Sequence, residues 1–246
     1  MLFLYGFGCP FPVEARMNRG FCALVAVAIA AALVLCGCAA RQAMHPITTF
    51  VVPDYSARAI KTVGLMPIAE RAGVQEAGPK LLPVLEAQLA TKTAYVFLSQ
   101  EQVLGSVQKS GVTDRYNKLL SGWRDNGSIS AEDAVAVAQK AGTDALMLVE
   151  VSTWSREYVP ANVEGESVSK VGLKAVLVSG KTGEKLWESY DEQSLQSAHY
   201  SPESGIGTYI DQAGMVRSSG KGGVPEPPPI EEVALRVVND VFRVLP

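Results

Sequence analysis

One stretch of the chain formally fits a motif that binds phosphate. Residues 175–182 read AVLVSGKT, a relaxed form of the glycine-rich loop whose backbone N–H groups cradle phosphate at the start of a helix. The intervening residues are strand-forming valine and leucine, and a second strand pattern follows where a helix would be needed. The sequence therefore predicts a β-hairpin that turns at Gly180-Lys181-Thr182-Gly183, and no nucleotide site.

A second set of residues, Ser167-Val168-Ser169-Lys170 followed by Lys181-Thr182-Gly183, is similar to the serine acyl-enzyme motifs of penicillin-binding proteins and β-lactamases. In those enzymes the motifs lie far apart on a larger chain, and the Ser–Lys pair opens a helix. One predicted hairpin cannot supply that geometry. The two histidines, His45 and His199, have no plausible Ser or carboxylate pair near them in sequence. We therefore expect no catalytic residue, no metal site, no bound cofactor and hence no enzyme.

The first 37 residues have the pattern of an export signal. An uninterrupted apolar run extends from residue 21 to residue 35, with Arg19 shortly before it. A membrane-spanning helix needs roughly 20 apolar residues, whereas the core of a signal peptide needs roughly 7–15, so the run fits a signal peptide. Met17 is the more natural start, because Met17-Asn18-Arg19 is a short positive segment, whereas the preceding residues include Glu14 and prolines. Residues 1–37 are expected to be removed.

The end of this leader, Leu35-Cys36-Gly37-Cys38, resembles the lipobox of bacterial lipoproteins. The resemblance implies that Leu35 and Gly37 take part in signal recognition and that Cys38 carries a diacylglycerol and an N-acyl chain. Ala39 stands where an Asp would retain the protein at the inner membrane, which implies a lipid anchor on the periplasmic face of the outer membrane. More than one acyl chain makes such attachment stable.

Cysteine usage agrees with this interpretation. Cys9, Cys22 and Cys36 lie in the leader, and the lipid would occupy Cys38. The mature chain would then have no free thiol and no disulfide, although it would face an oxidising compartment. Thiol catalysis and cysteine-based metal sites are therefore excluded.

Composition limits the remaining function classes. The chain of 246 residues is 48% hydrophobic and 19% charged, with a mean hydropathy of +0.14, which is high for a soluble domain. The excess lies in the leader, and the remainder has an ordinary globular composition without a second long apolar run. The formal net charge is −3 and the basic residues are scattered, so a nucleic-acid partner is not expected.

Hydrophobic periodicity predicts one α/β domain over residues 58–245, after a lipidated tether over residues 38–57. The order of the predicted strands and helices along the chain predicts an α/β (α+β) fold, with a mixed sheet of about five strands and helices packed on it. A Gly-, Pro- and Ser-rich insertion is expected over residues 191–229. Strand patterns lie at 61–68, 94–98, 144–153, 169–179 and 184–190, and helical patterns at 79–92, 100–109, 115–123 (a turn or two), 130–141 and 230–245.

Within this order, Gly142-Thr143-Asp144-Ala145-Leu146 and Thr182-Gly183-Glu184-Lys185-Leu186-Trp187 carry a family resemblance. The pattern is similar to the α/β domain shared by the TolB amino-terminal domain, the curli-secretion lipoprotein and the lipoprotein activators of penicillin-binding proteins. The resemblance covers residues 58–245 and rests on pattern without a signature motif. It implies a TolB N-terminal-like fold preceded by a lipoprotein signal peptide.

Members of this group differ in what is added to the domain. The curli-secretion channel adds two hairpins that join a transmembrane barrel, and each spanning strand needs roughly 9–11 residues of alternating character. The connection 155–168 is too short for two such strands, and the insertion 191–229 is polar and rich in Gly, Ser and Pro. We therefore expect a non-enzymatic accessory or scaffold of an envelope complex that serves transport, secretion or peptidoglycan synthesis. The alternative is a subunit of an oligomeric outer-membrane secretion channel of the curli-secretion type.

The expected partner is an envelope protein or a second copy of the chain. Four residues of the insertion are candidates for an exposed partner surface: Tyr200, Tyr209, Ile210 and Met215. Packing of the insertion onto its own domain is an equally open interpretation of these four residues.

Overall fold

The computed structural model describes residues 47–71, 76–202, 207–210, 216–219 and 223–246, and residues 46–246 form one compact unit. Of residues 207–210 and 216–219 only the backbone is described. Leu35, Gly37, Cys38, Ala39 and Met215 therefore lie outside the described residues, and their assigned roles stay predictions. The described part of the chain contains no helix that is long and apolar enough to cross a membrane.

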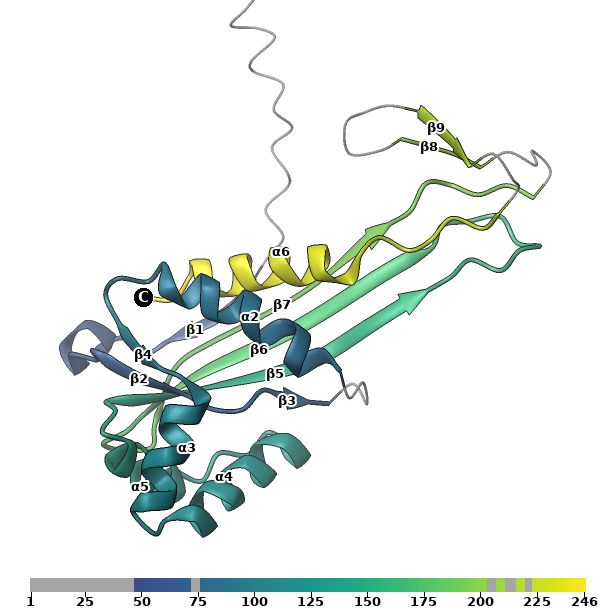
Figure 1. Ribbon diagram of the computed structural model, residues 1–246. Coiled ribbons are helices and arrows are strands. Elements are labelled where there is room, and N and C mark those ends of the chain that lie inside the picture. Colours follow the sequence, from purple (N-terminus) through teal and green to yellow (C-terminus); the bar gives the residue numbers. More distant parts are fainter. Residues whose placement is uncertain (1–46, 72–75, 203–206, 211–215, 220–222) are drawn as a thin grey trace, which may run out of the picture. The chain divides into compact units, whose positions relative to one another are not determined.

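The unit contains a mixed sheet with helices on both faces, as Figure 1 shows. The strand order is β1-β7-β6-β5-β2-β4, and β3 pairs with β5 outside this path. The strands β2, β3 and β4 join the sheet in parallel pairs, whereas β1, β6 and β7 pair antiparallel. The strands are β1 (Thr48–Val51), β2 (Thr62–Leu65), β3 (Ala69–Glu70), β4 (Val96–Leu98), β5 (Ala145–Glu157), β6 (Val168–Ser179), β7 (Lys185–Gln196) and the separate pair β8 (Gly207–Ile210) and β9 (Val216–Ser219).

The helices form two layers, one on each face of the sheet. Side chains of α2 and α6 pack on one face with Met147 and Val149, and those of α3, α4 and α5 pack on the other face with Leu146 and Leu148. Successive residues of β5 therefore enter opposite cores, which explains its continuous apolar run. The helices are η1 (Tyr55–Arg58), α2 (Ala77–Ala90), α3 (Gln100–Lys109), α4 (Thr113–Asn126), α5 (Ala131–Ala141) and α6 (Ile230–Arg243).

The helix boundaries follow local signals. The Ser99 side chain accepts a hydrogen bond from the backbone N–H of Gln102, whose own side chain bonds the backbone N–H of Ser99, a capping box that starts α3. The Ser130 hydroxyl caps α5 by accepting from the N–H of Asp133, and Gly142 ends that helix in the left-handed conformation. The mixed α/β class and the order of its main elements are thus confirmed.

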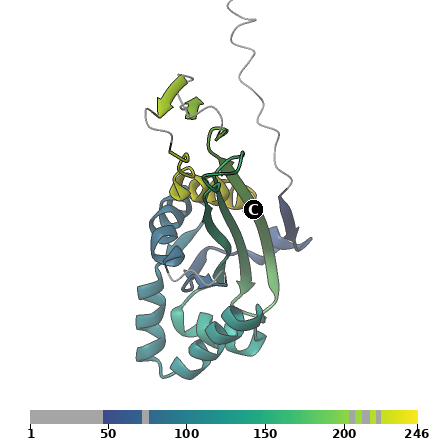
Figure 2. The ribbon, with the colours of Figure 1, turned by 90° about the vertical axis from the view of Figure 1, so that its right-hand side faces the viewer.

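The predicted tether over residues 38–57 was wrong in its second half. Residues Thr48–Val51 form β1, which pairs with β7 at the edge of the sheet, and Tyr55–Arg58 form η1. Figure 2 shows β1, drawn in purple, along the edge of the green strands. Every residue of β1 is exposed, so no burial pattern revealed the strand. Backbone hydrogen bonds to β7 hold it, and the Lys185 ammonium lies 5.1 Å from the centre of the Phe50 ring.

Three further expectations were too conservative. The sheet has seven strands where about five were expected, because β1 and the two-residue β3 add to it. The helix α4 covers fourteen residues in place of a turn or two, and its buried stripe of Tyr116, Leu119 and Trp123 stands among polar neighbours. The strand β7 extends to Gln196, so the first six residues of the predicted insertion 191–229 belong to the sheet. Alternate side chains of this part of the strand are exposed, which explains why its sequence is polar.

Candidate functional site

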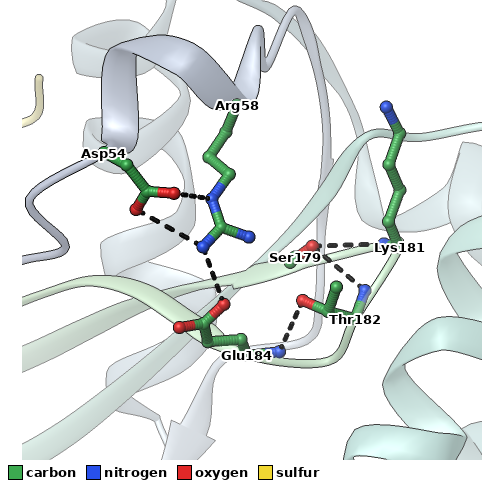
Figure 3. A network of polar contacts seen from close by, with 6 residues as sticks. All are labelled: Asp54, Arg58, Ser179, Lys181, Thr182 and Glu184. Carbon is green, nitrogen blue, oxygen red and sulfur yellow. Dashed lines mark hydrogen bonds and ion pairs between the residues drawn. The ribbon is translucent and has the colours of Figure 1, made fainter.

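The turn between β6 and β7 carries the phosphate-loop pattern, and its backbone N–H groups are already bonded within the protein (Figure 3). The Ser179 hydroxyl accepts from the N–H groups of Lys181 and Thr182, both at 3.2 Å, and the Thr182 hydroxyl accepts from the N–H of Glu184 at 3.3 Å. The N–H of Gly183 donates to the carbonyl of Ser179 and that of Gly180 to the carbonyl of Asp144. This turn therefore has no spare amides for phosphate, and the predicted hairpin is confirmed.

The same turn is tied to the segment that precedes the domain core. The Arg58 guanidinium of η1 lies 2.8 Å from Asp54 and 3.0 Å from Glu184, as Figure 3 shows. The hydrogen bond to Asp54 raises the pKa of Arg58, and the same contact lowers the pKa of Asp54. The Lys181 side chain points away from this network and is exposed. Exposed ion pairs of this kind contribute little free energy. We therefore regard this network as a local link between η1 and the turn and not as a functional site.

Asp144, from the family-like segment Gly142–Leu146, joins the starts of two parallel strands. Its carboxylate accepts from the N–H groups of Lys61 and Thr62 at 3.0 and 2.9 Å and from the Thr62 hydroxyl at 3.0 Å. The bond from the Thr62 N–H lowers the pKa of Asp144. The aspartate of this segment therefore positions β2 beside β5, and no substrate role is needed to explain it.

The opposite end of the sheet is built differently. The strands β5, β6 and β7 extend beyond the helices α3, α4 and α5, as Figure 1 shows. We define the tip as residues 158–167, 197–202 and 223–229, which close the far end of these three strands. The tip includes the proline-rich segment, Val224-Pro225-Glu226-Pro227-Pro228-Pro229, which leads into α6.

Three side chains hold this proline-rich segment: Arg156 on β5, Ser167 in the tip and Ser169 on β6. The Ser167 hydroxyl donates to the carbonyl oxygen of Pro225 at 2.6 Å, and the Ser169 hydroxyl donates to that of Pro228 at 2.5 Å. Arg156 donates to the carbonyl oxygen of Pro227 at 2.8 Å. Proline has no N–H, so its carbonyl is the only backbone group that needs a partner. Ser167 and Ser169 are fully buried, and the tip is therefore braced by specific polar contacts.

Tyr200 belongs to this brace and not to an exposed surface. It is 7% exposed, its hydroxyl donates to the carbonyl of Ala161 at 2.8 Å, and its backbone pairs with Gly165 in both directions. The prediction that Tyr200 is available to a partner was wrong, because the loop packs onto its own domain there. Tyr209 and Ile210 lie in β8, of which only the backbone is described, so their role stays a prediction.

The tip exposes other apolar side chains that sequence reasoning missed. Tyr158 is 57% exposed and Val163 is 46% exposed, and the Arg156 guanidinium lies 5.9 Å from the centre of the Tyr158 ring. Both residues lie in the connection between β5 and β6, whose sequence is mostly polar. Only their exposure in the structure distinguishes them from apolar residues that pack in the core. Tyr158 and Val163 are therefore candidate contact residues next to a braced backbone.

Charged residues flank these apolar side chains. His199 Nε2 lies 2.9 Å from Glu164, and its Nδ1 lies 3.8 Å from Glu166. The hydrogen bond to Glu164 raises the pKa of His199. The imidazole therefore links the segment after β7 to two carboxylates of the β5–β6 connection, which lie more than 30 residues away in sequence.

Other potential sites are less developed. An open pocket of about 300 Å³ lies between α2, β4 and α3, lined by Leu89, Phe97, Leu98 and the charged Glu86 and Lys92. Its lining brings no nucleophile together with a base. Within the described ranges, no group of three or more His, Cys, Asp or Glu side chains could hold a metal ion.

No family model matches this chain, and no curated protein matches it. Several solved structures resemble it at low identity. Lipoprotein GNA1162 from Neisseria meningitidis is 18% identical, with 55% of this chain and 83% of that chain covered and a TM-score of 0.38. The PelC dodecamer from Paraburkholderia phytofirmans is 13% identical over 80% and 96% of the two chains, with a TM-score of 0.40. The LpoB C-terminal domain from Salmonella enterica is 16% identical over 55% and 82%, with a TM-score of 0.36. Such remote likenesses transfer no role to this chain.

Proposed function

We propose that the protein is a non-enzymatic, lipid-anchored accessory or scaffold of a cell-envelope complex, and that it binds its partner through the tip. The leader supports the anchor, because an apolar run, the small Gly37 and Cys38 follow one another in the order that a lipobox requires. Attachment to the periplasmic face of the outer membrane follows from Ala39, and the acyl chains on Cys38 are the only added groups that the proposal requires.

The way the tip is built is the observation that carries the binding role. The buried hydroxyls of Ser167 and Ser169 fix a proline-rich segment at the end of the sheet, and the Ser167 hydroxyl also accepts from the backbone N–H of Val159 at 3.0 Å. Next to this fixed backbone, Tyr158 and Val163 expose apolar surface to solvent. Holding such side chains in place lowers the conformational entropy lost on association, so a partner gains affinity from the brace.

The test compares two surface variants of the lipidated chain in living cells. Tyr158→Ser with Val163→Ser removes the apolar surface of the tip, and Leu235→Ser removes an equally exposed apolar side chain on α6 as the matched control. Partners captured by crosslinking from the envelope are compared for both variants and the parent. We expect a partner that the tip variant loses and the control variant retains. Equal capture by all three proteins would contradict the binding role of the tip.

A deletion variant asks whether the segment with β8 and β9 takes part. Residues 203–222 are replaced by a short Gly-Ser linker, which is sterically possible because Ser197 and Pro225 both bond to Ser167. This deletion leaves β7 and the proline-rich segment in place. Loss of the same partner would assign Tyr209, Ile210 and Met215 to the binding surface, and full retention would remove them from it.

The alternative, a subunit of an outer-membrane secretion channel, makes a different prediction. A channel subunit extracted in detergent would run as a closed oligomer and conduct ions in planar bilayers. A monomer that conducts nothing would eliminate the alternative and leave the accessory role standing.

A further inference from the structure

The strand β1 leaves one edge of the sheet open. It ends the strand order, so β7 is its only neighbour among the described strands, and Figure 2 shows it at the outer side of the green strands. Charges, prolines and bulges are devices that protect edge strands from further pairing. The segment Thr48–Val51 contains no charge and no proline, and its register against β7 has no shift. Another strand can therefore pair with this edge without meeting such an obstacle in β1.

The hydrogen bonds to β7 decide which backbone groups face the open edge. The N–H of Val52 donates to the carbonyl of Leu186 at 3.0 Å, so the backbone groups of Val52 point toward β7. These groups alternate in direction along an antiparallel strand. Those of Phe50 therefore also point toward β7, whereas Thr49 and Val51 direct their N–H and C=O groups toward the open edge. An added strand would meet two donors and two acceptors there.

The same edge exposes apolar side chains on both faces of the sheet. Phe50 is 44% exposed and Val51 is 41% exposed, and successive side chains of a strand point to opposite faces. The Lys185 ammonium lies 5.1 Å from the centre of the Phe50 ring and 2.6 Å from a carboxylate oxygen of Glu188. Because Glu188 compensates this charge, Lys185 adds little repulsion between two such edges.

We infer that the open edge of β1 pairs with β1 of a second copy of the chain, antiparallel and about a two-fold axis at Phe50. In this register each Thr49 lies opposite the Val51 of the other copy, so all four outward backbone groups of each strand find a partner. The two Phe50 side chains become a directly opposed pair across the axis, and aromatic pairs of this kind stabilise antiparallel strands. The interface uses the same patch on both copies, as a two-fold dimer requires.

The neighbouring two-fold registers fit less well. An axis at Val51 would place Thr49 opposite Pro53, which has no N–H to donate. An axis at Thr49 would place Val51 opposite Ile47, which lies outside the strand. Only the axis at Phe50 pairs the outward residues of β1 with one another. This self-complementarity is the reason to assign the edge to a second copy of the chain.

Cysteine crosslinking tests both the contact and its register. Phe50→Cys places two thiols directly opposite each other, in a pair whose Cα atoms are about 4.5 Å apart and within reach of a disulfide. Thr49→Cys is the matched control, because its two thiols would be offset by two residues along the strands. Val96→Cys, at a position of β4 that is 59% exposed, measures random collision.

Membranes from cells that produce each full-length variant are oxidised with copper phenanthroline, and the dimer is measured on non-reducing gels. The parent chain, with its four own cysteines, gives the background. We expect several-fold more dimer from Phe50→Cys than from Thr49→Cys or Val96→Cys. Equal yields from the three variants would indicate random collision, and a higher yield from Thr49→Cys would indicate another register. Either result, or a yield from Phe50→Cys no higher than the background, would overturn the inference.

A proline variant tests whether backbone pairing holds the two copies together. Val51→Pro removes an N–H that faces the open edge and no hydrogen bond to β7, and edge strands tolerate proline at such positions. In the Phe50→Cys chain it should lower the dimer yield to that of the controls, whereas Val51→Ala, which keeps the N–H, should retain most of it. Circular dichroism of both variants should match the parent. Equal dimer yields from the two would refute the backbone pairing.

The inference is independent of the proposed function, because neither the anchor at Cys38 nor the tip takes part in the pairing of β1. Tyr158→Ser with Val163→Ser should therefore leave the dimer yield of Phe50→Cys unchanged, even where these changes abolish the capture of a partner. Loss of the crosslink in this tip variant would show that two copies meet through the tip, and it would overturn the assignment to β1.

Discussion

The Ser169 hydroxyl on β6 donates a hydrogen bond of 2.5 Å to the carbonyl oxygen of Pro228, a residue 59 positions further along the chain. This contact, with its neighbour between Ser167 and Pro225, fixes the segment that connects the tip to α6. Neither serine has solvent access, so each hydroxyl must find its partner within the protein.

Removing one of these hydroxyls should cost stability. Ser169→Ala leaves the Pro228 carbonyl without its donor, and we expect the free energy of unfolding to fall by about 1–3 kcal/mol. Ser194→Ala, at an exposed position of β7, is the matched control and should change it by less than about 0.5 kcal/mol. Urea denaturation followed by circular dichroism measures both. If the two variants lose equal stability, the brace has no energetic role.

Two carboxylates that flank Lys174 should respond oppositely to pH. Burial raises the pKa of Glu150 above its usual 4.5, although Arg71 lies 2.9 Å from one of its oxygens. The folded state then binds a proton more tightly than the unfolded state, so this group contributes stability that is lost as pH rises through the folded pKa. Relative to wild type, Glu150→Gln should therefore gain stability as pH increases from 4.5 upward.

Glu188 is the matched carboxylate on β7. Burial opposes its ionisation, yet the hydrogen bond from Lys185 and the charge of Lys174, 3.3 Å away, together lower its pKa. Its stabilising contribution is present above pH 4.5 and is lost as pH falls through the lowered pKa. Glu188→Gln should therefore lose stability relative to wild type near neutral pH and approach it in acid. Parallel pH profiles for the two variants would contradict at least one of the two assignments.

A glycine pair tests the β6–β7 turn. Gly183 has a φ of 71°, and an added Cβ would lie 2.4–2.5 Å from atoms of Ala131. Gly183→Ala should destabilise the fold by at least about 1 kcal/mol, because the left-handed conformation alone costs that much. Gly105→Ala is the control, because α3 has open space there, and it should stabilise by about 0.4–1 kcal/mol. Thermal unfolding of both proteins shows whether the signs differ; the same sign for both would refute this account.

The tip histidine provides a spectroscopic reporter. The hydrogen bond to Glu164 holds the pKa of His199 above its usual 6.5. Glu164→Gln should move this pKa downward, whereas Glu157→Gln, at a carboxylate that pairs with Lys170, should leave it nearly unchanged. NMR titration of the imidazole protons measures the shift, with His199→Gln to assign the signal. An unaltered titration in Glu164→Gln would show that the contact does not exist in solution.

Local physical chemistry made much of the fold predictable. The helix α6 repeats its apolar residues with helical periodicity along its whole length, and α5 has a serine at its start and a glycine at its end. The hairpin of β6 and β7 follows from two strand patterns around a Gly-Lys-Thr-Gly turn. Such signals lie within a few residues of one another, so they are visible without knowledge of the tertiary structure.

The edge strand and the exposed side chains of the tip could not be predicted in the same way. The edge strand β1 buries none of its own side chains and is held by backbone hydrogen bonds to β7, a strand more than 130 residues later. Tyr200 and Tyr158 are both tyrosines in irregular segments, yet one is packed and the other exposed. Burial of a loop residue depends on which distant segment covers it, and composition does not contain that information.

The sequence by itself determined the class of the fold and the boundaries of its strongest helices, and it predicts a leader and an anchor at Cys38. Only the tertiary structure decided that the tether ends at Thr48, that Tyr200 is packed and that Tyr158 and Val163 are presented at the tip. The physical reason is the range of the interactions. Periodicity and capping act over one or two helical turns, whereas the Ser167–Pro225 and Ser169–Pro228 contacts join residues 58 and 59 positions apart.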